Sequence, residues 1–130
     1  MPPLRVLIVD DNADFLAAAR RLLEHEGINV VAVASSGAEA LRHNQEHKPD
    51  VILVDVDLGQ ENGFDVVEHL AAETESHQPV VLISAYPEQD LKDLLETSPA
   101  IGFISKSQLS ANAIVEVLDG RGREEGSGSS

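Results

Sequence analysis

The sequence predicts an α/β fold in which five helices cover a single doubly wound sheet of five parallel strands. Five short apolar runs of strand-forming residues alternate with five segments whose apolar residues recur at helical spacing. Elements that alternate in this way form parallel sheets with helices on both faces. At 130 residues the chain can form one domain with a sizeable core, and an aromatic content of 3% makes that core aliphatic.

The apolar runs place the strands in order along the chain. We expect them at residues 4–9, 28–34, 51–54, 80–83 and 101–105. The first, third and fourth runs are apolar almost throughout, as central strands are, whereas the second is rich in small residues and suits an edge. Pro79 stands immediately before the fourth run.

Helical periodicity follows each strand. It predicts helices at residues 14–26, 38–47, 64–71, 91–95 and 114–118. Gly27 stands where the first helix needs a C-terminal cap, Ser35 or Ser36 can cap the second helix, and Pro49 ends it. Residues 120–130 carry no apolar side chain, so we expect a domain at 4–119 and then a disordered tail or the start of a linker.

Composition argues against several classes of function. A formal net charge of −14 is unsuited to binding DNA or anionic lipid, because phosphate contacts need clustered lysine and arginine. Without cysteine there is no disulfide, thiolate metal site or cysteine nucleophile. No apolar stretch reaches membrane-spanning length, and the first residues lack the apolar core of a signal peptide. We therefore expect a cytoplasmic protein.

Carboxylates follow two of the expected strands. Asp55 closes the third apolar run, and the pair Asp10-Asp11 closes the first. Three carboxylates at one edge of the sheet repel one another unless a proton or a cation intervenes. Mg²⁺ suits such a site because it prefers oxygen ligands. On spacing alone, solvated loop acids are an equal alternative.

The fourth and fifth expected strands also end in polar residues. Ser84 ends the fourth strand and Lys106 ends the fifth. In a doubly wound sheet, ligands bind beyond the carboxyl ends of the strands. Alone, Ser84 fits a small strand-end residue and Lys106 a surface lysine, but their convergence with the acids favours a functional site.

Taken together, these motifs resemble the receiver domain of two-component response regulators over residues 4–119. The resemblance is carried by Leu-Ile-Val-Asp10-Asp11, Val-Ile-Leu-Val-Asp55 with the later Asn62-Gly63, Ile83-Ser84-Ala85, and Gly102-Phe103-Ile104-Ser105-Lys106. It implies a flavodoxin/CheY-like sheet with strand order 2-1-3-4-5. It also implies a phosphoacceptor domain that assists its own phosphorylation and dephosphorylation, and not an enzyme.

The resemblance assigns roles to the strand-end residues. Asp55 holds the position of the phosphoryl-accepting aspartate in a Mg²⁺-dependent reaction. Asp11 and Asp55 would bind the Mg²⁺ with the backbone carbonyl of Asp57, while Asp10 would act nearby or through water. Lys106 would place its positive charge on the phosphoryl oxygens.

The resemblance also implies a conformational switch. Ser84 would donate its hydroxyl once Asp55 is phosphorylated, and this movement would be coupled to Phe103, three residues before Lys106. Phe103 lacks a hydroxyl group, so we expect it to move inward by packing alone.

Three residues depart from the family's pattern. Gly59 replaces a common proline, which loosens the loop after the acceptor. Ser107 replaces the usual proline behind a cis peptide bond, and a cis bond before serine costs about 2.5–4 kcal/mol. We therefore expect either a trans bond with a shifted Lys106 or a strained cis bond. Asp57 adds negative charge and can orient water, so we hypothesise that it shortens the lifetime of phosphorylated Asp55.

The expected partner is a sensor histidine kinase or a phosphotransfer protein. No DNA-binding or enzymatic segment follows Asp119, so we expect a stand-alone regulator or a receiver cut from a longer protein, with an unknown target. A monomer or weak dimer is expected, because Lys92 is nearly alone among acids on the face that dimerises in DNA-binding relatives.

Alternative functions carry different signals. The string Val-Ile-Leu-Val-Asp55-Val-Asp57 is similar to the first motif of haloacid-dehalogenase-type phosphatases, but that reading leaves Asp10-Asp11 unexplained. A receiver-like interaction module independent of phosphorylation is a second alternative. Separately, His43 and His47 have the i,i+4 spacing of a metal site, yet without a third ligand in view a solvated face is expected.

Overall fold

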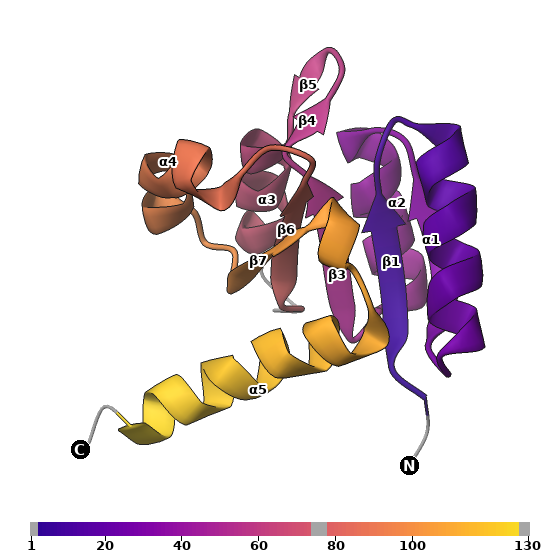
Figure 1. Ribbon diagram of the computed structural model, residues 1–130. Helices are drawn as coiled ribbons and strands as arrows, with labels where there is room; N and C mark the ends of the chain where they lie inside the picture. The colour runs from indigo at the N-terminus through magenta and orange to yellow at the C-terminus, as the bar shows by residue number, and fades with distance from the viewer. Residues whose placement is uncertain (1–2, 74–77, 128–130) are drawn as a thin grey trace.

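A computed structural model describes residues 3–73 and 78–127, with side chains up to residue 120 (Figure 1). Its main sheet has five parallel strands in the order β2-β1-β3-β6-β7. These strands are β1 (Arg5–Val9), β2 (Asn29–Ala34), β3 (Val51–Asp55), β6 (Val80–Ser84) and β7 (Gly102–Ser105). Because β4 and β5 form a separate small sheet, this order confirms the predicted 2-1-3-4-5 arrangement.

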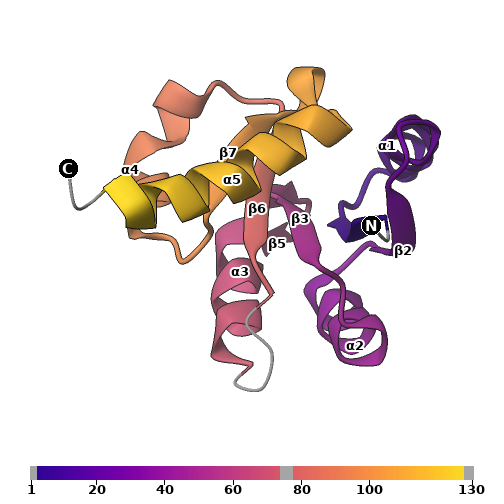
Figure 2. The same ribbon diagram turned by 90° about the horizontal axis from the view of Figure 1, so that it is seen from below.

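Helices cover both faces of the sheet. α1 and α5 lie on one face and α2 and α3 on the other (Figure 2). Helix α4 follows a short 3-10 turn, η1, beside the β6–β7 edge. The bounds are α1 (Ala13–His25), α2 (Gly37–His47), α3 (Gly63–Ala72), η1 (Glu88–Leu91), α4 (Lys92–Thr97), η2 (Lys106–Gln108) and α5 (Ala111–Ser127).

The core is aliphatic, as the composition predicts. Every residue of β3 and β6 is buried, and the largest fully buried side chains are all leucine, isoleucine or valine. Burying one such side chain contributes about 1.5–3 kcal/mol, so the central strands are the most stably held part of the sheet. They fix the positions of the residues at their carboxyl ends.

Local caps set the ends of the helices that flank the site. Asn12 caps α1, and its side chain accepts a hydrogen bond from the Phe15 N–H. Of the two predicted candidates for α2, Ser36 is the cap, and its Oγ accepts from the Glu39 N–H. Each such cap contributes about 1 kcal/mol.

A β-hairpin follows Asp55 where the sequence shows only a loop. Strands β4 (Asp57–Leu58) and β5 (Glu61–Asn62) pair antiparallel, and they project beyond the carboxyl end of the main sheet (Figure 1). Gly59 enters the turn at a φ of +75°, which glycine adopts at little cost. Two-residue strands carry no apolar run, so the strand signal is too short to detect.

The C-terminal helix runs further than expected. α5 continues to Ser127, whereas the sequence predicts a tail or linker from residue 120. Arginine and glutamate at 121 and 123–125 are good helix formers, and a helix needs no apolar face to continue from one that is already docked. The boundary at residue 119 stays a prediction, and residues 128–130 lie outside the described range. Within the described residues, no helix has the length and apolar character needed to cross a membrane.

Candidate functional site

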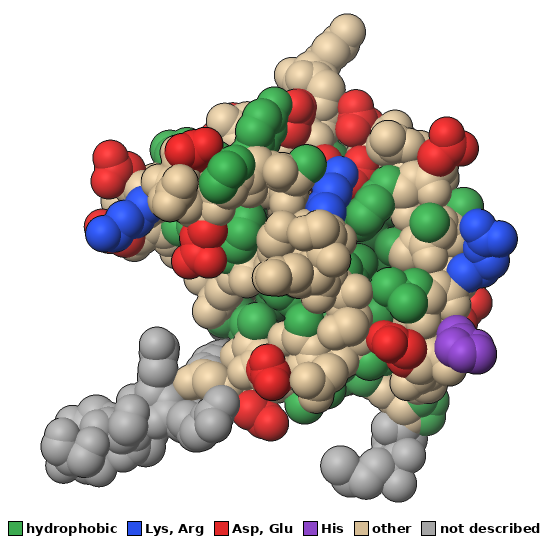
Figure 3. Space-filling model, in the orientation of Figure 1, with side chains coloured by type: hydrophobic (Ala, Val, Ile, Leu, Met, Phe, Trp, Pro, Cys, Tyr) green, Lys and Arg blue, Asp and Glu red, His purple; other side chains and the backbone are tan. Residues whose placement is uncertain are grey.

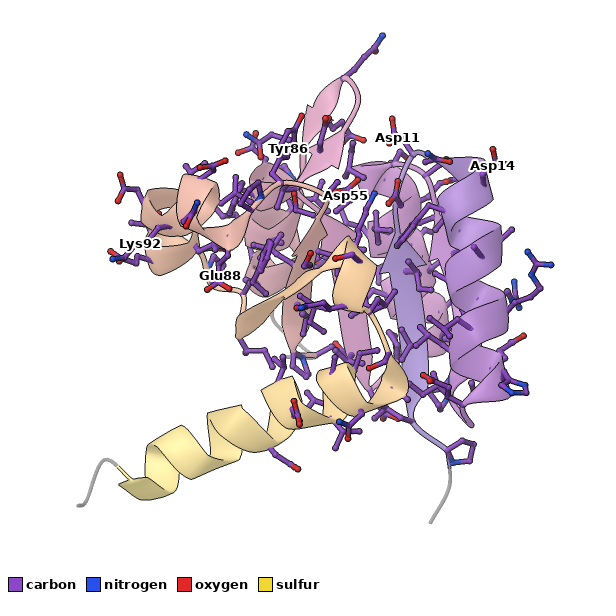
Figure 4. All side chains as sticks on the ribbon, viewed as in Figure 1. Asp11, Asp14, Asp55, Tyr86, Glu88 and Lys92 are labelled. Atoms are coloured by element: carbon purple, nitrogen blue, oxygen red, sulfur yellow. The ribbon has the colours of Figure 1, made fainter. Side chains whose placement is uncertain are left out.

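Three carboxylates meet at the carboxyl ends of β1 and β3. The two strands are neighbours in register, with Val9 opposite Val54, so Asp10 and Asp55 follow side by side. Asp10 is fully buried, Asp55 is 5% exposed and Asp11 is exposed. One carboxylate oxygen from each lies within 4.8 Å of the others. Figure 4 shows Asp11 and Asp55 at the same end of the sheet.

Lys106 inserts its ammonium between two of these acids. Its Nζ lies 2.6 Å from Asp10 Oδ2 and donates a hydrogen bond of 3.0 Å to Asp55 Oδ2. The Phe15 ring of α1 supports the ammonium from another side, with its centroid 4.3 Å from Nζ. Three carboxylates with one ammonium keep an excess of negative charge, which favours a further cation. Several acidic side chains lie at the upper end of the face in Figure 3, so the surroundings add to that excess.

Burial and charge shift the pKa values of Asp55 and Lys106. Burial raises the pKa of the Asp55 carboxyl to about 6, and the Asp10 charge adds to the rise against the opposing hydrogen bond from Lys106. Burial lowers the pKa of Lys106, but hydrogen bonds and charges of Asp10 and Asp55 outweigh it, so the net shift is upward. The lysine therefore stays charged, and Asp55 can exchange a proton for a cation near neutral pH.

A cleft of about 260 Å³ opens over this cluster. It is lined by Asp10, Asp11, Asn12, Asp55, Asp57, Gly59, Ser84, Ala85, Tyr86 and Lys106. The structure thus brings together six of the seven residues that the sequence singles out for the site. Phe103, the seventh, lies on β7 opposite Leu82 and packs against the core layer beneath α2 and α3.

Ser84 lies beside Asp55 on the neighbouring strand. Ser84 is fully buried, and its Oγ accepts a hydrogen bond of 2.9 Å from the Tyr86 N–H. Strand β6 pairs with β3 so that Ile83 faces Asp55, which places Ser84 one step further along the cleft. The hydroxyl proton of Ser84 makes no hydrogen bond within the described residues, so it can be donated to a ligand in the cleft.

Asp57 and Gly59 form the wall on the hairpin side. The Asp57 N–H donates to Asp55 Oδ1 at 3.3 Å, while Asp57 Oδ1 accepts from the Gly59 N–H at 3.0 Å. The Asp57 carboxylate is exposed and does not join the three clustered acids. A Cβ at Gly59 would lie 2.7 Å from Asp11 Oδ2, so glycine leaves that acid room.

The peptide bond after Lys106 is trans, which is one of the two expected alternatives, and the accompanying shift of Lys106 stays a prediction. All described peptide bonds are trans, including the one before Ser107, so the strained cis alternative is wrong. The trans chain enters the 3-10 turn η2 at Lys106, and the long lysine side chain still reaches both acids. The lysine side chain is a flexible chain of four carbons, so Lys106 can contact Asp10 and Asp55 although the peptide bond that follows it is trans.

Sequence reasoning missed three residues of the site. Phe15 reads as ordinary core on the first helix, although it supports Lys106. Tyr86 is 54% exposed at the rim of the cleft and carried no motif signal. The sequence indicates no role for Gly63, yet a Cβ there would collide with the backbone carbonyl oxygen of Asp55. Only the last had a detectable signal, the Asn62-Gly63 pair.

Comparison with known proteins identifies the family. The response regulator receiver domain family matches residues 6–119. The transcriptional regulatory protein PdtaR of Mycobacterium tuberculosis is 30% identical over 104 residues, which cover 80% of this chain and 50% of PdtaR. PrrA of the same organism, also a transcriptional regulatory protein, is 43% identical over 81 residues, covering 62% of this chain and 34% of PrrA. The chain thus spans about half or less of these curated relatives.

A solved structure agrees with this assignment. The signal receiver domain of NarL from Mycobacterium tuberculosis is 31% identical and superposes with a TM-score of 0.76, covering 93% of this chain and 98% of that domain. The family match over residues 6–119 includes the strand ends that build the acidic cleft. This chain therefore belongs to the response regulator receiver domain family of two-component signalling.

Proposed function

We propose that Asp55 accepts a phosphoryl group from the phosphohistidine of a sensor histidine kinase or a phosphotransfer protein. One observation carries the proposal: a nearly buried carboxylate stands in a cleft beside two further acids, with a lysine ammonium 3.0 Å from its Oδ2. Receiver domains of this family are phosphoacceptors, and histidine kinases phosphorylate them. The acceptor position in this chain is Asp55.

The transfer balances as a displacement at phosphorus. A carboxylate oxygen of Asp55 attacks the phosphorus atom, the P–N bond of the donor phosphohistidine breaks, and its electron pair returns to the imidazole nitrogen. The product is an acyl phosphate on Asp55. Lys106 stabilises the charge that the transferred oxygens carry in the transition state, and its position between Asp10 and Asp55 supports that role.

The donor set of the cleft fits Mg²⁺. Asp11 and Asp55 would hold the ion through carboxylate oxygens, with the backbone carbonyl of Asp57, while Asp10, already paired with Lys106, acts nearby or through water. When bound, the ion offsets the repulsion between the acceptor carboxylate and the incoming phosphoryl group. The surplus of carboxylates over ammonium groups supports this assignment.

Phosphorylation would act through Ser84 and Phe103. The Ser84 Oγ accepts from the Tyr86 N–H, so its own proton is available to a phosphoryl oxygen on Asp55. Phe103 is only partly buried and lines a cavity of about 520 Å³ with Glu88 and Val117. Inward movement of its ring would change the face between α4 and α5 and bias a two-state equilibrium there.

The test is phosphotransfer from candidate kinases, with and without Mg²⁺. We expect one phosphoryl group per chain, none on Asp55→Asn, and none when a chelator removes Mg²⁺. A wild-type chain that accepts no phosphoryl group from kinases or from a small phosphodonor would revive the phosphorylation-independent interaction module.

Asp57 is proposed to shorten the life of the acyl phosphate. Its carboxylate lines the cleft beside Asp55 and can orient a water molecule for attack. We expect Asp57→Asn to slow loss of the phosphoryl group several-fold, measured by decay of the labelled protein after the donor is removed. The exposed Asp65→Asn variant on α3 is the matched control. An unchanged decay rate in Asp57→Asn would refute this role.

The phosphatase alternative finds no support in the family assignment. The match over residues 6–119 includes β1 and the Asp10-Asp11 pair, which that alternative leaves unexplained. Stoichiometric phosphorylation without turnover of small phosphate esters is the expected result.

A further inference from the structure

The last turn of α2 gathers three metal-ligating side chains away from the acidic cleft. His43, Glu46 and His47 stand at i, i+3 and i+4, which places them on one face of the helix. One ligand atom of each lies within 4.8 Å of the others. The two imidazole rings have centroids 5.7 Å apart and are tilted by 34°. Glu46 is therefore the third ligand beside the two histidines.

The metal-ligating side chains of α2 are free to turn toward a metal ion. The Nδ1 atom of His43 is buried without a hydrogen bond in the described structure, so nothing fixes its tautomer. His47 Nε2 lies 4.0 Å from Glu46 Oε2, and these side chains are 37% and 55% exposed. Half-exposed side chains can rotate, and a tetrahedral ion with bonds of 2.0–2.2 Å needs its ligand atoms only about 3.4 Å apart.

The end of the helix also favours a cation. The last turn carries the negative end of the helix dipole, and the chain has a formal net charge of −14. Arg5 donates hydrogen bonds to the backbone carbonyls of His47 and Lys48. Its positive charge opposes a cation, but its bonds also hold the turn that presents the ligands.

We propose that His43, Glu46 and His47 form a surface site for a borderline divalent metal of the zinc class. Two imidazoles and one carboxylate suit Zn²⁺, whereas Mg²⁺ prefers the oxygen-only cleft. The α2 zinc site, as we call these three residues, is independent of the Asp55 cluster. A bound ion would tie the last turn of α2 together and stabilise the folded state by mass action.

The test is Zn²⁺ binding to the tag-free chain in excess Mg²⁺, which occupies the acidic cleft. Calorimetric titration should give one Zn²⁺ per chain, and Zn²⁺ should raise the melting temperature. His47→Gln and Glu46→Gln each remove one ligand from a half-exposed position. Each should weaken binding on the order of tenfold or more, because even outer-shell changes cost 10–100-fold.

His25→Gln is the matched control, because His25 also lies in the last turn of a helix but has no second histidine on its face. It should bind Zn²⁺ as the wild type does, and histidine ring resonances should shift for His43 and His47 alone. The proposal is overturned if His47→Gln binds like the wild type, or if Asp55→Asn, not His47→Gln, abolishes binding.

Discussion

The acidic cleft and the α2 zinc site each bring three ligand side chains within 4.8 Å of one another, but by different means. In the cleft, the carboxylates come from strands far apart in sequence, two of them are buried, and a lysine is paired with them. On α2, two imidazoles and a carboxylate come from one partly exposed helical turn. Burial and oxygen ligands suit a hard ion that takes part in chemistry, whereas nitrogen ligands near the surface suit a softer ion that stabilises a helix end.

Of the predicted changes, replacing Lys106 in the cleft should have the largest effect, and it should affect the cleft without affecting the α2 zinc site. We expect Lys106→Met to slow phosphorylation of Asp55 about 10²–10³-fold, as loss of one preorganised charge does elsewhere. Mg²⁺ should still bind, since two acids lose the cation that competes for them. Rates from phosphotransfer time courses check this.

The exposed Lys92 on α4 supplies the control, because Lys92→Met removes an equal charge outside the cleft. Zn²⁺ binding on α2 should be unchanged in both variants. A Lys106→Met rate within a few-fold of the wild type would mean that the ammonium balances the buried acids without assisting transfer.

Neutralising the acceptor should stabilise the metal-free fold. The folded state raises the pKa of Asp55 from the usual 3.8 to about 6, chiefly by burial, so it binds more protons than the unfolded state between these values. Stability therefore falls as pH rises through that window. At pH 7 without metal, Asp55→Asn should be more stable than the wild type by about 1–2 kcal/mol, after allowance for solvent screening.

Urea unfolding in the presence of a chelator measures this difference. It should nearly vanish at pH 4, where the folded wild type has its acceptor protonated, and it should shrink at pH 7 when Mg²⁺ is added. A difference that is the same at both pH values would show that ionisation of Asp55 is not its cause. The α2 zinc site should be unaffected, because its ligands do not contact Asp55.

The smallest expected effect concerns Phe15. Its ring lies 4.3 Å from Lys106 Nζ, and such cation–π contacts contribute about 0.5–1 kcal/mol at partly exposed sites. Phe15→Leu keeps the apolar bulk and should slow phosphorylation about two- to five-fold. Combining it with Lys106→Met tests the mechanism, since the two losses should not add if Phe15 acts only through the lysine.

The positions of the five main strands along the chain were predictable because each contains a short apolar run, whereas their order in the sheet was implied by the resemblance to receiver domains. The strands that lead to Asp10, Asp55 and Ser84 were therefore predictable from the sequence, and so was the edge of the sheet at which these residues meet. The β4–β5 hairpin was not predictable, since Asp57–Leu58 and Glu61–Asn62 are too short and too polar to read as strands. The trans bond at Ser107 was one of two alternatives that the sequence left open.

By itself, the sequence determined which residues stand at the carboxyl ends of the strands, because periodicity and turn residues are local signals. Only the tertiary structure decided what those residues contact. Lys106 meets Asp55 across 51 positions of sequence, and Phe15 reaches the same ammonium from the first helix. Such pairings depend on how the helices pack against the sheet, which no local pattern encodes. Even at the i,i+4 histidine pair, side-chain orientation decided that Glu46 completes the ligand set.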